Sequence, residues 1–279
     1  MTISPIRKKK MDIVNKYEKQ QISAIQEWKN KTPTGMDKTF SLMALPLAWV
    51  LDWITTDESI QETLIHANDA AADAADHNYL LEHANIKSIP KMKDKTLEEC
   101  DKFALEAQNW GLATATTGGT LIGAAGVCSI SSDIHFVITL ALRTIHNIGL
   151  CYGYAGKNDE YRQFVLGILA ASAANSQEEK DEALQALGFS MQSIPRQAKQ
   201  SIASKATANA MAKGAKYIGL NSLAERLGIN ITKRKALQAV PAFGAFVGGS
   251  VNWLYLHDVS IAARRIFQER WLRENDKLY

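Results

Sequence analysis

The chain has 279 residues, of which 46% are hydrophobic and 22% charged, with a formal net charge of +3. A chain of this length and composition can bury one large core, and so small a net charge gives no whole-molecule attraction to nucleic acid. Three widely spaced cysteines, Cys100, Cys128 and Cys151, form no CxxC pair. They argue against disulfides and structural zinc, and they favour a reducing compartment.

Residues 1–35 predict a basic amphipathic helix. One face of the helix expected between Ile6 and Trp28 collects Val14, Tyr17, Gln21, Ile25 and Trp28, with lysines around it. No apolar segment follows the basic start, so we expect a cytoplasmic protein without a secretory signal. The helix either packs on the core or lies on anionic lipid at the inner face of the membrane.

Residues 36–279 predict a single all-α domain, because no stretch alternates as a strand does. The expected elements are a helix at 39–54 kinked at Pro46, a long helix at 57–84 and a surface loop at 86–95. Thr96 and Glu99 form a capping box that begins a helix running toward Trp110. Asn158 precedes a helix at 161–174, and Gly188 is expected to end a helix at 177–187, followed by a helical region at 195–227.

Two glycine-rich apolar helical hairpins are expected at the centre of the domain. The first joins 111–130 to 134–150 with a break at Ser131–Asp133, and the second joins 235–256 to 258–273. Asp133 and Asp258 are the expected N-caps of the second helices. Residues 110–132 and 236–256 lack charge, but their Gly, Ala and Thr content favours buried helices over membrane spans.

The two hairpins show a weak internal repeat. An offset of 125 residues relates Gly119 to Gly244, Gly123 to Gly248, and Asp133 to Asp258. Glycines four residues apart let two helix backbones approach closely. We expect the two glycine stripes to face each other or a shared helix, although chance similarity explains the offset equally well.

The sequence resembles the EcsC family over residues 97–272. The residues that carry the resemblance are Ala115–Gly123, Asp133, Arg143, Tyr152-Gly-Tyr154, Arg162-Gln-Phe164, Leu166–Leu169, Val240–Gly244, Gly248-Gly249, Asn252, Asp258, Ala262-Ala-Arg264 and Phe267. The resemblance implies a bacterial helical protein from a family without an established activity, named after a protein encoded beside an ABC transporter. The turn after Tyr154 often carries an acidic residue in the family, whereas Ala155-Gly156-Lys157 stands here.

Two groups of side chains are candidates for metal or acid–base chemistry. The first group would share one helical face and consists of His66, Asp69, Asp73, Asp76 and His77. Such a face could bind a metal ion, as in helical bundles, or it could be a solvated acidic surface. Asp133, His135, His257 and Asp258 would converge if the hairpins packed side by side, giving a catalytic or metal site. The alternative is that both aspartates only cap helices. His135 and His146 lie about 16 Å apart along one helix, too far for one metal ion.

Four arginines sit in or beside apolar helices and require partners. Arg143, Arg162, Arg264 and Arg265 are expected to pair with Asp133, Asp159, Asp258 or Glu269, or to bind a phosphate or lipid headgroup. The candidate ligand- or lipid-binding residues are Gly119, Gly123, Arg143, Tyr152, Tyr154, Gly244, Gly248, Asn252 and Arg264.

No HExxH, GxSxG, GxxxxGK[ST] or GxGxxG motif is present. We therefore favour a non-catalytic, cytoplasmic or membrane-peripheral protein that binds a lipid-like ligand, a membrane surface or a protein partner through its glycine-rich hairpins; no cofactor can be named. The alternatives are a metal-dependent hydrolase-like enzyme using the Asp/His cluster, and a protein whose hairpins insert into membranes conditionally or form a pore.

Overall fold

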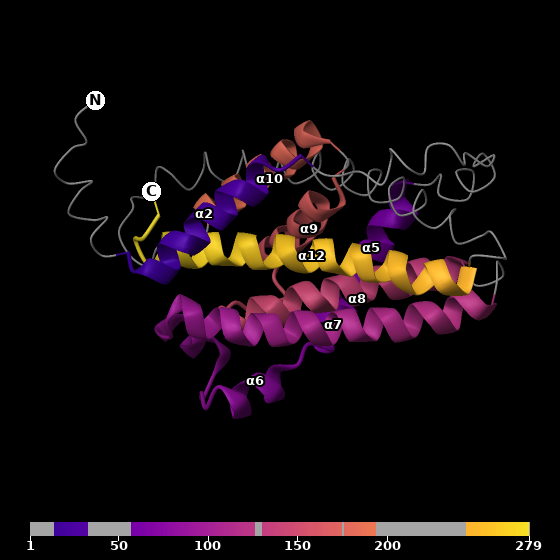
Figure 1. Cartoon of the computed structure of the whole chain (residues 1–279), viewed down its shortest axis with the longest axis horizontal. Helices are drawn as coiled ribbons and strands as arrows, with labels where there is room; N and C mark the ends of the chain where they lie inside the picture. The colour runs from indigo at the N-terminus through magenta and orange to yellow at the C-terminus, as the bar shows by residue number, and fades with distance from the viewer. Residues whose placement is uncertain (1–13, 33–56, 126–129, 175, 194–243, 279) are drawn as a thin grey trace.

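The computed structural model describes residues 14–32, 57–125, 130–174, 176–193 and 244–278 (Figure 1), and every regular element among them is helical. These elements are α2 (Lys16–Asn30), α5 (Asp57–Asp73), α6 (His77–His83), the 3-10 helix η2 (Ile89–Asp94), α7 (Leu97–Ala125), α8 (Ile130–Cys151), α9 (Asp159–Ala173), α10 (Gln177–Ser193) and α12 (Gly244–Glu274). The all-α prediction is confirmed. The expected helix around Pro46 and the helical region at 195–227 lie outside the described residues.

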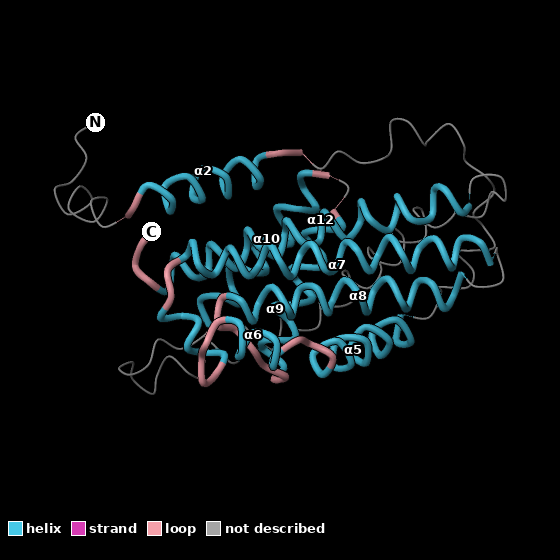
Figure 2. Tube along the Cα trace, turned by 60° about the horizontal axis from the view of Figure 1, so that its bottom comes forward, coloured by secondary structure: helices cyan, strands magenta, loops and turns pink. Residues whose placement is uncertain are grey.

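Three long helices, α7, α8 and α12, lie side by side and form the central layer (Figures 1 and 2). The helix α9 packs on α12 and α8, while α5 and α6 pack on α8 and α2 lies on α12. The core contains buried aliphatic side chains together with Tyr152, Phe164 and Phe267, which are all fully buried. The interior is thus formed mainly by the apolar faces of α7, α8, α9 and α12.

The predicted hairpin breaks are wrong. The helix α8 already begins at Ile130, so Asp133 lies inside it and is not its N-cap. Asp258 lies near the middle of the continuous helix α12 and also caps nothing. The polar signal at Asp258 does not stop the helix because its carboxylate stays exposed while Val259 and Ala262 continue the buried face.

Local capping signals were more reliable. In the capping box before α7, Glu99 N–H donates to the Thr96 hydroxyl and the Glu99 carboxylate accepts from Thr96 N–H. Asn158 caps α9 by accepting from Tyr161 N–H at 2.9 Å. Gly188, however, does not end α10, which continues to Ser193.

The single long helix predicted at 57–84 is divided into α5 and α6. The division falls next to Asp76, whose N–H donates to Asn147 Oδ1 at 2.8 Å and whose carboxylate accepts from Asn147 and Arg143. These contacts from α8 replace hydrogen bonds that a continuous helix would make. The expected surface loop at 86–95 likewise contains η2, which buries Ile89 and Met92.

Candidate functional site

A buried carboxylate joins α2, α7 and α12. Asp101 on α7 is 1% exposed and accepts hydrogen bonds from the Tyr17 hydroxyl (2.6 Å), the Tyr152 hydroxyl and the Gln268 amide. Burial and this carboxylate raise the pKa of both tyrosines, so both hydroxyls remain protonated donors. Because a buried charge is tolerated when its lone pairs are satisfied, the arrangement fixes the fold and needs no chemical role.

The turn formed by Tyr152, Gly153 and Tyr154 is part of the same core. The Tyr154 ring stacks on Phe267 with centroids 5.6 Å apart, and the Arg270 guanidinium lies 4.1 Å from the Tyr154 centroid. Gly153 has a φ of 83°, and a Cβ there would meet the backbone and side chain of Lys93. Both tyrosines, which are candidate ligand-binding residues, therefore serve in packing.

Each carboxylate of the predicted acidic face has a basic partner from another part of the chain. Asp69 pairs with Arg162 of α9 at 3.2 Å, and Asp76 pairs with Arg143 of α8 at 2.8 Å. Asp73 pairs with Lys157. Within the described ranges, no three His, Cys, Asp or Glu side chains are grouped so that they could hold a metal ion. The acidic face is thus a row of ion pairs that holds α5 against α8 and α9, with His66 exposed beside it.

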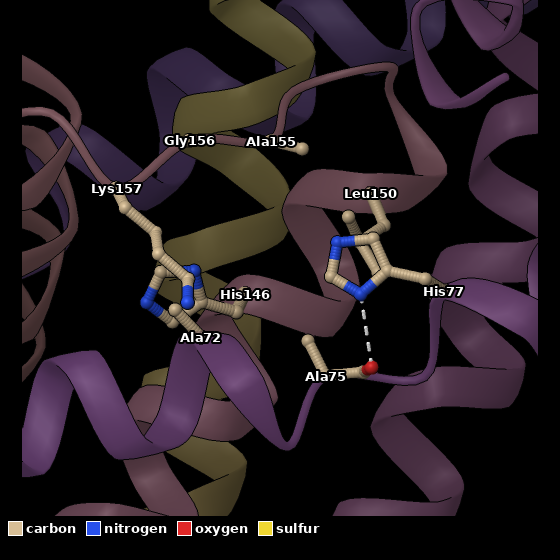
Figure 3. A pocket seen from close by; sticks show the side chains of 8 residues that line it. All are labelled: Ala72, Ala75, His77, His146, Leu150, Ala155, Gly156 and Lys157. Carbon is tan, nitrogen blue, oxygen red and sulfur yellow. Dashed lines mark hydrogen bonds between the residues drawn. The ribbon is translucent and has the colours of Figure 1, made fainter.

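A pocket of about 280 Å³ opens beside this row (Figure 3). Its lining consists of Ala72, Ala75, His77, His146, Leu150, Ala155, Gly156 and Lys157. His77 Nδ1 lies 3.0 Å from the Ala75 carbonyl oxygen, and His146 Nε2 lies 3.1 Å from Asn68 Oδ1. Since both oxygens only accept, these two nitrogens carry the hydrogens and the other nitrogen of each ring is an acceptor.

The electrostatics of this pocket favour neutral imidazole at His146. Burial, and then the neighbouring His77 ring, lower the pKa of His146 to about 4. The Lys157 ammonium at the rim is engaged by Asp73 (Figure 3 shows its position). The lining offers hydrogen-bond acceptors but no nucleophile activated by a neighbouring base, so the arrangement favours structure or weak binding over catalysis.

One of the four arginines has an expected partner, and the other three have different partners. Arg162 does pair with Asp159, at 2.7 Å, as well as with Asp69. Arg264 donates to Gln108 at 3.2 Å, and Arg265 donates to Gln21 of α2 and to Gln268. Glu269 instead binds Lys29 and Arg273. Arginine partners in this structure are thus often amides, which sequence reasoning about charge pairs overlooks.

The predicted Asp/His cluster required Asp133 and Asp258 to begin helices at the same end of the bundle. Asp258 instead lies in mid-helix, where it is 3.8 Å from His257 and where His257 stacks on Trp253. The side chains of Asp133 and His135 lie outside the described residues, as do those of Asn252 and of the glycine stripes. The described part of the chain thus gives no contact that would join the four residues.

Cys100 and Cys151 are buried free thiols. Burial raises the pKa of Cys100 to about 12 and raises that of Cys151 further, so both remain protonated and poorly nucleophilic.

The arrangement of the three central helices brings their uncharged segments together. Arg264 meets Gln108 and Gln268 meets Asp101, so α7 and α12 are antiparallel. A Cβ at Gly111 of α7 would meet Thr144 of α8, and both residues lie fourteen positions from the close helix ends at Ala125 and Ile130, so these two helices are antiparallel as well. Residues 107–125, 130–142 and 244–256, which contain Asp133 as their one charged residue, therefore share one end of the bundle. We call it the uncharged end; it lies at the right of Figure 1, away from the C-terminus.

Large apolar side chains are exposed where the uncharged end begins. Trp110 of α7 is 68% exposed, and Trp253 and Leu254 of α12 are 36% and 41% exposed. Leu105 and Tyr79 are also exposed, but they belong to the half of the molecule that carries the charges. In the part of the chain that the structure describes, no helix combines the length and apolar character needed to cross a membrane.

The profile of the EcsC protein family matches residues 19–272, nearly the whole chain. The chain belongs to the EcsC family. One similar relative is "Uncharacterized protein YdbA" of Bacillus subtilis (strain 168), which is 30% identical over 97 residues. That alignment covers 32% of this chain and 36% of the relative, so the likeness concerns about a third of each protein. No solved structure matches the chain.

Two features of this EcsC protein were missed by sequence reasoning. Asp101 follows a capping box and resembles any acidic residue near a helix N-terminus, so its burial had no local signal. Trp110 was placed at the end of one helix and at the start of the charge-free segment 110–132, but its exposure was not predicted.

Proposed function

We propose that this EcsC protein is a non-catalytic helical protein that docks on membrane surfaces through its uncharged end. The observation that carries this proposal is the exposure of Trp110, at 68%, beside helical segments whose one charged residue is Asp133. Monomeric proteins bury most tryptophan surface, and Trp is enriched where proteins meet the interface between lipid headgroups and chains.

The position of the exposed side chains supports a membrane over a small ligand. Trp110 belongs to α7, whereas Trp253 and Leu254 belong to α12. The exposed apolar side chains thus lie on two different helices at one end of the bundle. The described pocket beside His146 lies elsewhere and is about 280 Å³, small for a lipid chain.

The basic helix α2 has a different role from the docking end. Tyr17 and Gln21 bind polar groups of α7 and α12, Ile25 is fully buried, and Lys29 pairs with Glu269. Removing α2 would leave Asp101 and Glu269 buried without these partners, so α2 is an integral part of the fold. Deleting the helix is therefore an unsuitable test of membrane binding, and single substitutions are needed.

The test is flotation of the purified protein with phosphatidylcholine vesicles. Trp110→Ala should lower the bound fraction severalfold, because it removes the most exposed aromatic side chain at the boundary. Tyr79→Ala is the matched control, since Tyr79 is 48% exposed on α6. Absence of wild-type binding, or equal losses in both variants, would overturn the proposal.

A further inference from the structure

We infer that the pocket beside His146 binds a small aromatic molecule of one or two rings that carries an N–H donor, and that His146 Nδ1 accepts the hydrogen bond from this N–H. The site consists of two imidazole rings in a space whose other walls are small and apolar (Figure 3). It shares no residue with the exposed side chains of the proposed docking end, Trp110, Trp253 and Leu254, and does not depend on their role.

His146 presents an unused hydrogen-bond acceptor to the pocket. Its Nε2 lies 3.1 Å from Asn68 Oδ1, so the hydrogen is on Nε2 and the lone pair is on Nδ1. The His146 side chain is 4% exposed and lines the pocket, and its Nδ1 has no hydrogen-bond partner among the described residues. Because this lone pair is shielded from bulk water, a hydrogen bond to it is stronger than one at the surface. Burial lowers the pKa of His146 to about 4, so Nδ1 remains an acceptor at pH 7.

The second imidazole ring adds another acceptor. His77 Nδ1 lies 3.0 Å from the Ala75 carbonyl oxygen, which leaves the lone pair on His77 Nε2. Figure 3 shows His77 on one side of the space, and His146 with Lys157 on the other. The Lys157 ammonium, the one charged group of this lining, is already bound by Asp73. The ring nitrogens therefore favour a ligand that donates hydrogen bonds, because a carboxylate or phosphate at the same place would meet two lone pairs.

The remaining walls and the volume determine the size of the ligand. The walls between the two rings are formed by Ala72, Ala75, Leu150, Ala155 and Gly156. The space measures about 280 Å³, and a cavity of about 150 Å³ is large enough for benzene. Water against such walls makes few hydrogen bonds, so an apolar ring that displaces it gains affinity. One ring or two fused rings therefore match the pocket.

The rim of the pocket favours an aromatic ligand over a saturated one. The side chains of Lys157 and Asp73 are 60% and 66% exposed, so their ion pair contributes little and the ammonium can move. An ammonium within about 6 Å of an aromatic ring, over its face, is attracted by the negative charge of that face. A saturated ring offers no such attraction to Lys157.

The experiment compares the binding of indole and of benzofuran, which has the same shape but an oxygen in place of the N–H. Calorimetric titration of the full chain at pH 7 measures both affinities. Indole should bind about tenfold tighter than benzofuran, because only indole can donate to His146 Nδ1. In His146→Phe, which keeps an aromatic ring but removes the acceptor, the two molecules should bind equally.

Two further variants test the location of the site. Ala155→Leu places a larger side chain in the pocket and should abolish indole binding, and the fold should tolerate it because Ala155 is exposed. Ala113→Leu is the matched control, since it adds the same side chain to an exposed alanine of α7 that does not line the pocket, and it should leave binding unchanged.

Four results would overturn the inferred site. These are the absence of indole binding, equal affinities of the wild type for indole and benzofuran, an unchanged preference for indole in His146→Phe, and indole binding retained in Ala155→Leu. The membrane proposal is tested separately by vesicle flotation, which involves none of the residues that line this pocket.

Discussion

Gln268 on α12 donates its side-chain amide to both carboxylate oxygens of Asp101 on α7, at 2.8 Å each. Two turns further along α7, Gln108 accepts from Arg264 at 3.2 Å. Together these contacts fix the direction and register of the two helices. They thereby place residues 244–256 beside the second half of α7, which creates the uncharged end. The hydrogen bonds around Asp101 and the position of the proposed docking end thus both depend on the same register between α7 and α12.

Asp101→Ala should lower the free energy of unfolding by about 3 kcal/mol or more, because it strands the buried donors Tyr152 and Gln268 and the partly buried Tyr17 hydroxyl. Urea unfolding followed by circular dichroism measures the change. Asp94→Ala is the control, since Asp94 forms an exposed ion pair with Lys91 and should change stability by less than about 0.5 kcal/mol. Similar effects of both substitutions would show that the Asp101 centre contributes little.

His146 should make the fold less stable in acid. Its pKa is about 4 in the folded protein against an ordinary 6.5, so between these values the unfolded chain binds a proton that the folded chain does not. Its contribution is complete above pH 6.5 and is lost as the pH falls toward 4. Between pH 7 and pH 5 the wild type should lose about 2 kcal/mol more than His146→Gln. Equal pH slopes of unfolding free energy in the two proteins would contradict this prediction.

Two glycine-to-alanine substitutions should have opposite effects. Gly153→Ala places a side chain at positive φ and against Lys93, and should cost about 2 kcal/mol or more. Gly188→Ala lies inside α10, where a Cβ would meet no atom within 4 Å, and should stabilise the protein by about 0.5 to 1 kcal/mol. Thermal unfolding of the pair provides the measurement. A stabilised Gly153→Ala protein would show that the turn can change its conformation.

Lys180→Met should loosen the end of α2. The Lys180 ammonium donates to the carbonyl oxygens of Trp28 and Lys31, where a helix C-terminus favours positive charge. Burial lowers the pKa of Lys180 to about 8, so the group remains largely protonated at pH 7. Hydrogen exchange should quicken at residues 28–32 in the variant and stay unchanged in α8. Uniformly faster exchange would indicate global destabilisation instead.

Local sequence patterns predicted helix starts well only where the capping partner lies a few residues away in the sequence. Thr96 with Glu99 and Asn158 with Tyr161 lie three residues apart, so their hydrogen bonds can be inferred from spacing. Asp258 resembles them in type, but the burial of Val259 and Ala262 against the bundle extends the helix through it. Burial against distant segments is absent from a local pattern.

Spacing along a single helix predicted which residues of the first helix face the core, but it could not predict the partners of the acidic residues. Ile25 is buried as the apolar spacing of α2 indicates, whereas Val14, which was assigned to the same helix, is buried just before the N-cap Asn15 where α2 begins. The partners of Asp69 and Asp76, in contrast, come from residues 162 and 143, between 67 and 93 positions away. Spacing on one helix reveals that carboxylates share a face, but the charge opposite that face depends on the tertiary fold.

The meeting of Glu18 with Lys277, at 2.5 Å, has a practical consequence for the orientation of the molecule. Segments near the beginning and the end of the chain lie together, remote from residues 125 and 244 (Figure 1). If the protein were attached to a solid surface by either segment, the other end of the bundle would face the solution. Tethering by residues near 14 or 278 would therefore give one uniform orientation, with the ends of α7 and α12 at residues 125 and 244 turned away from the tethering surface.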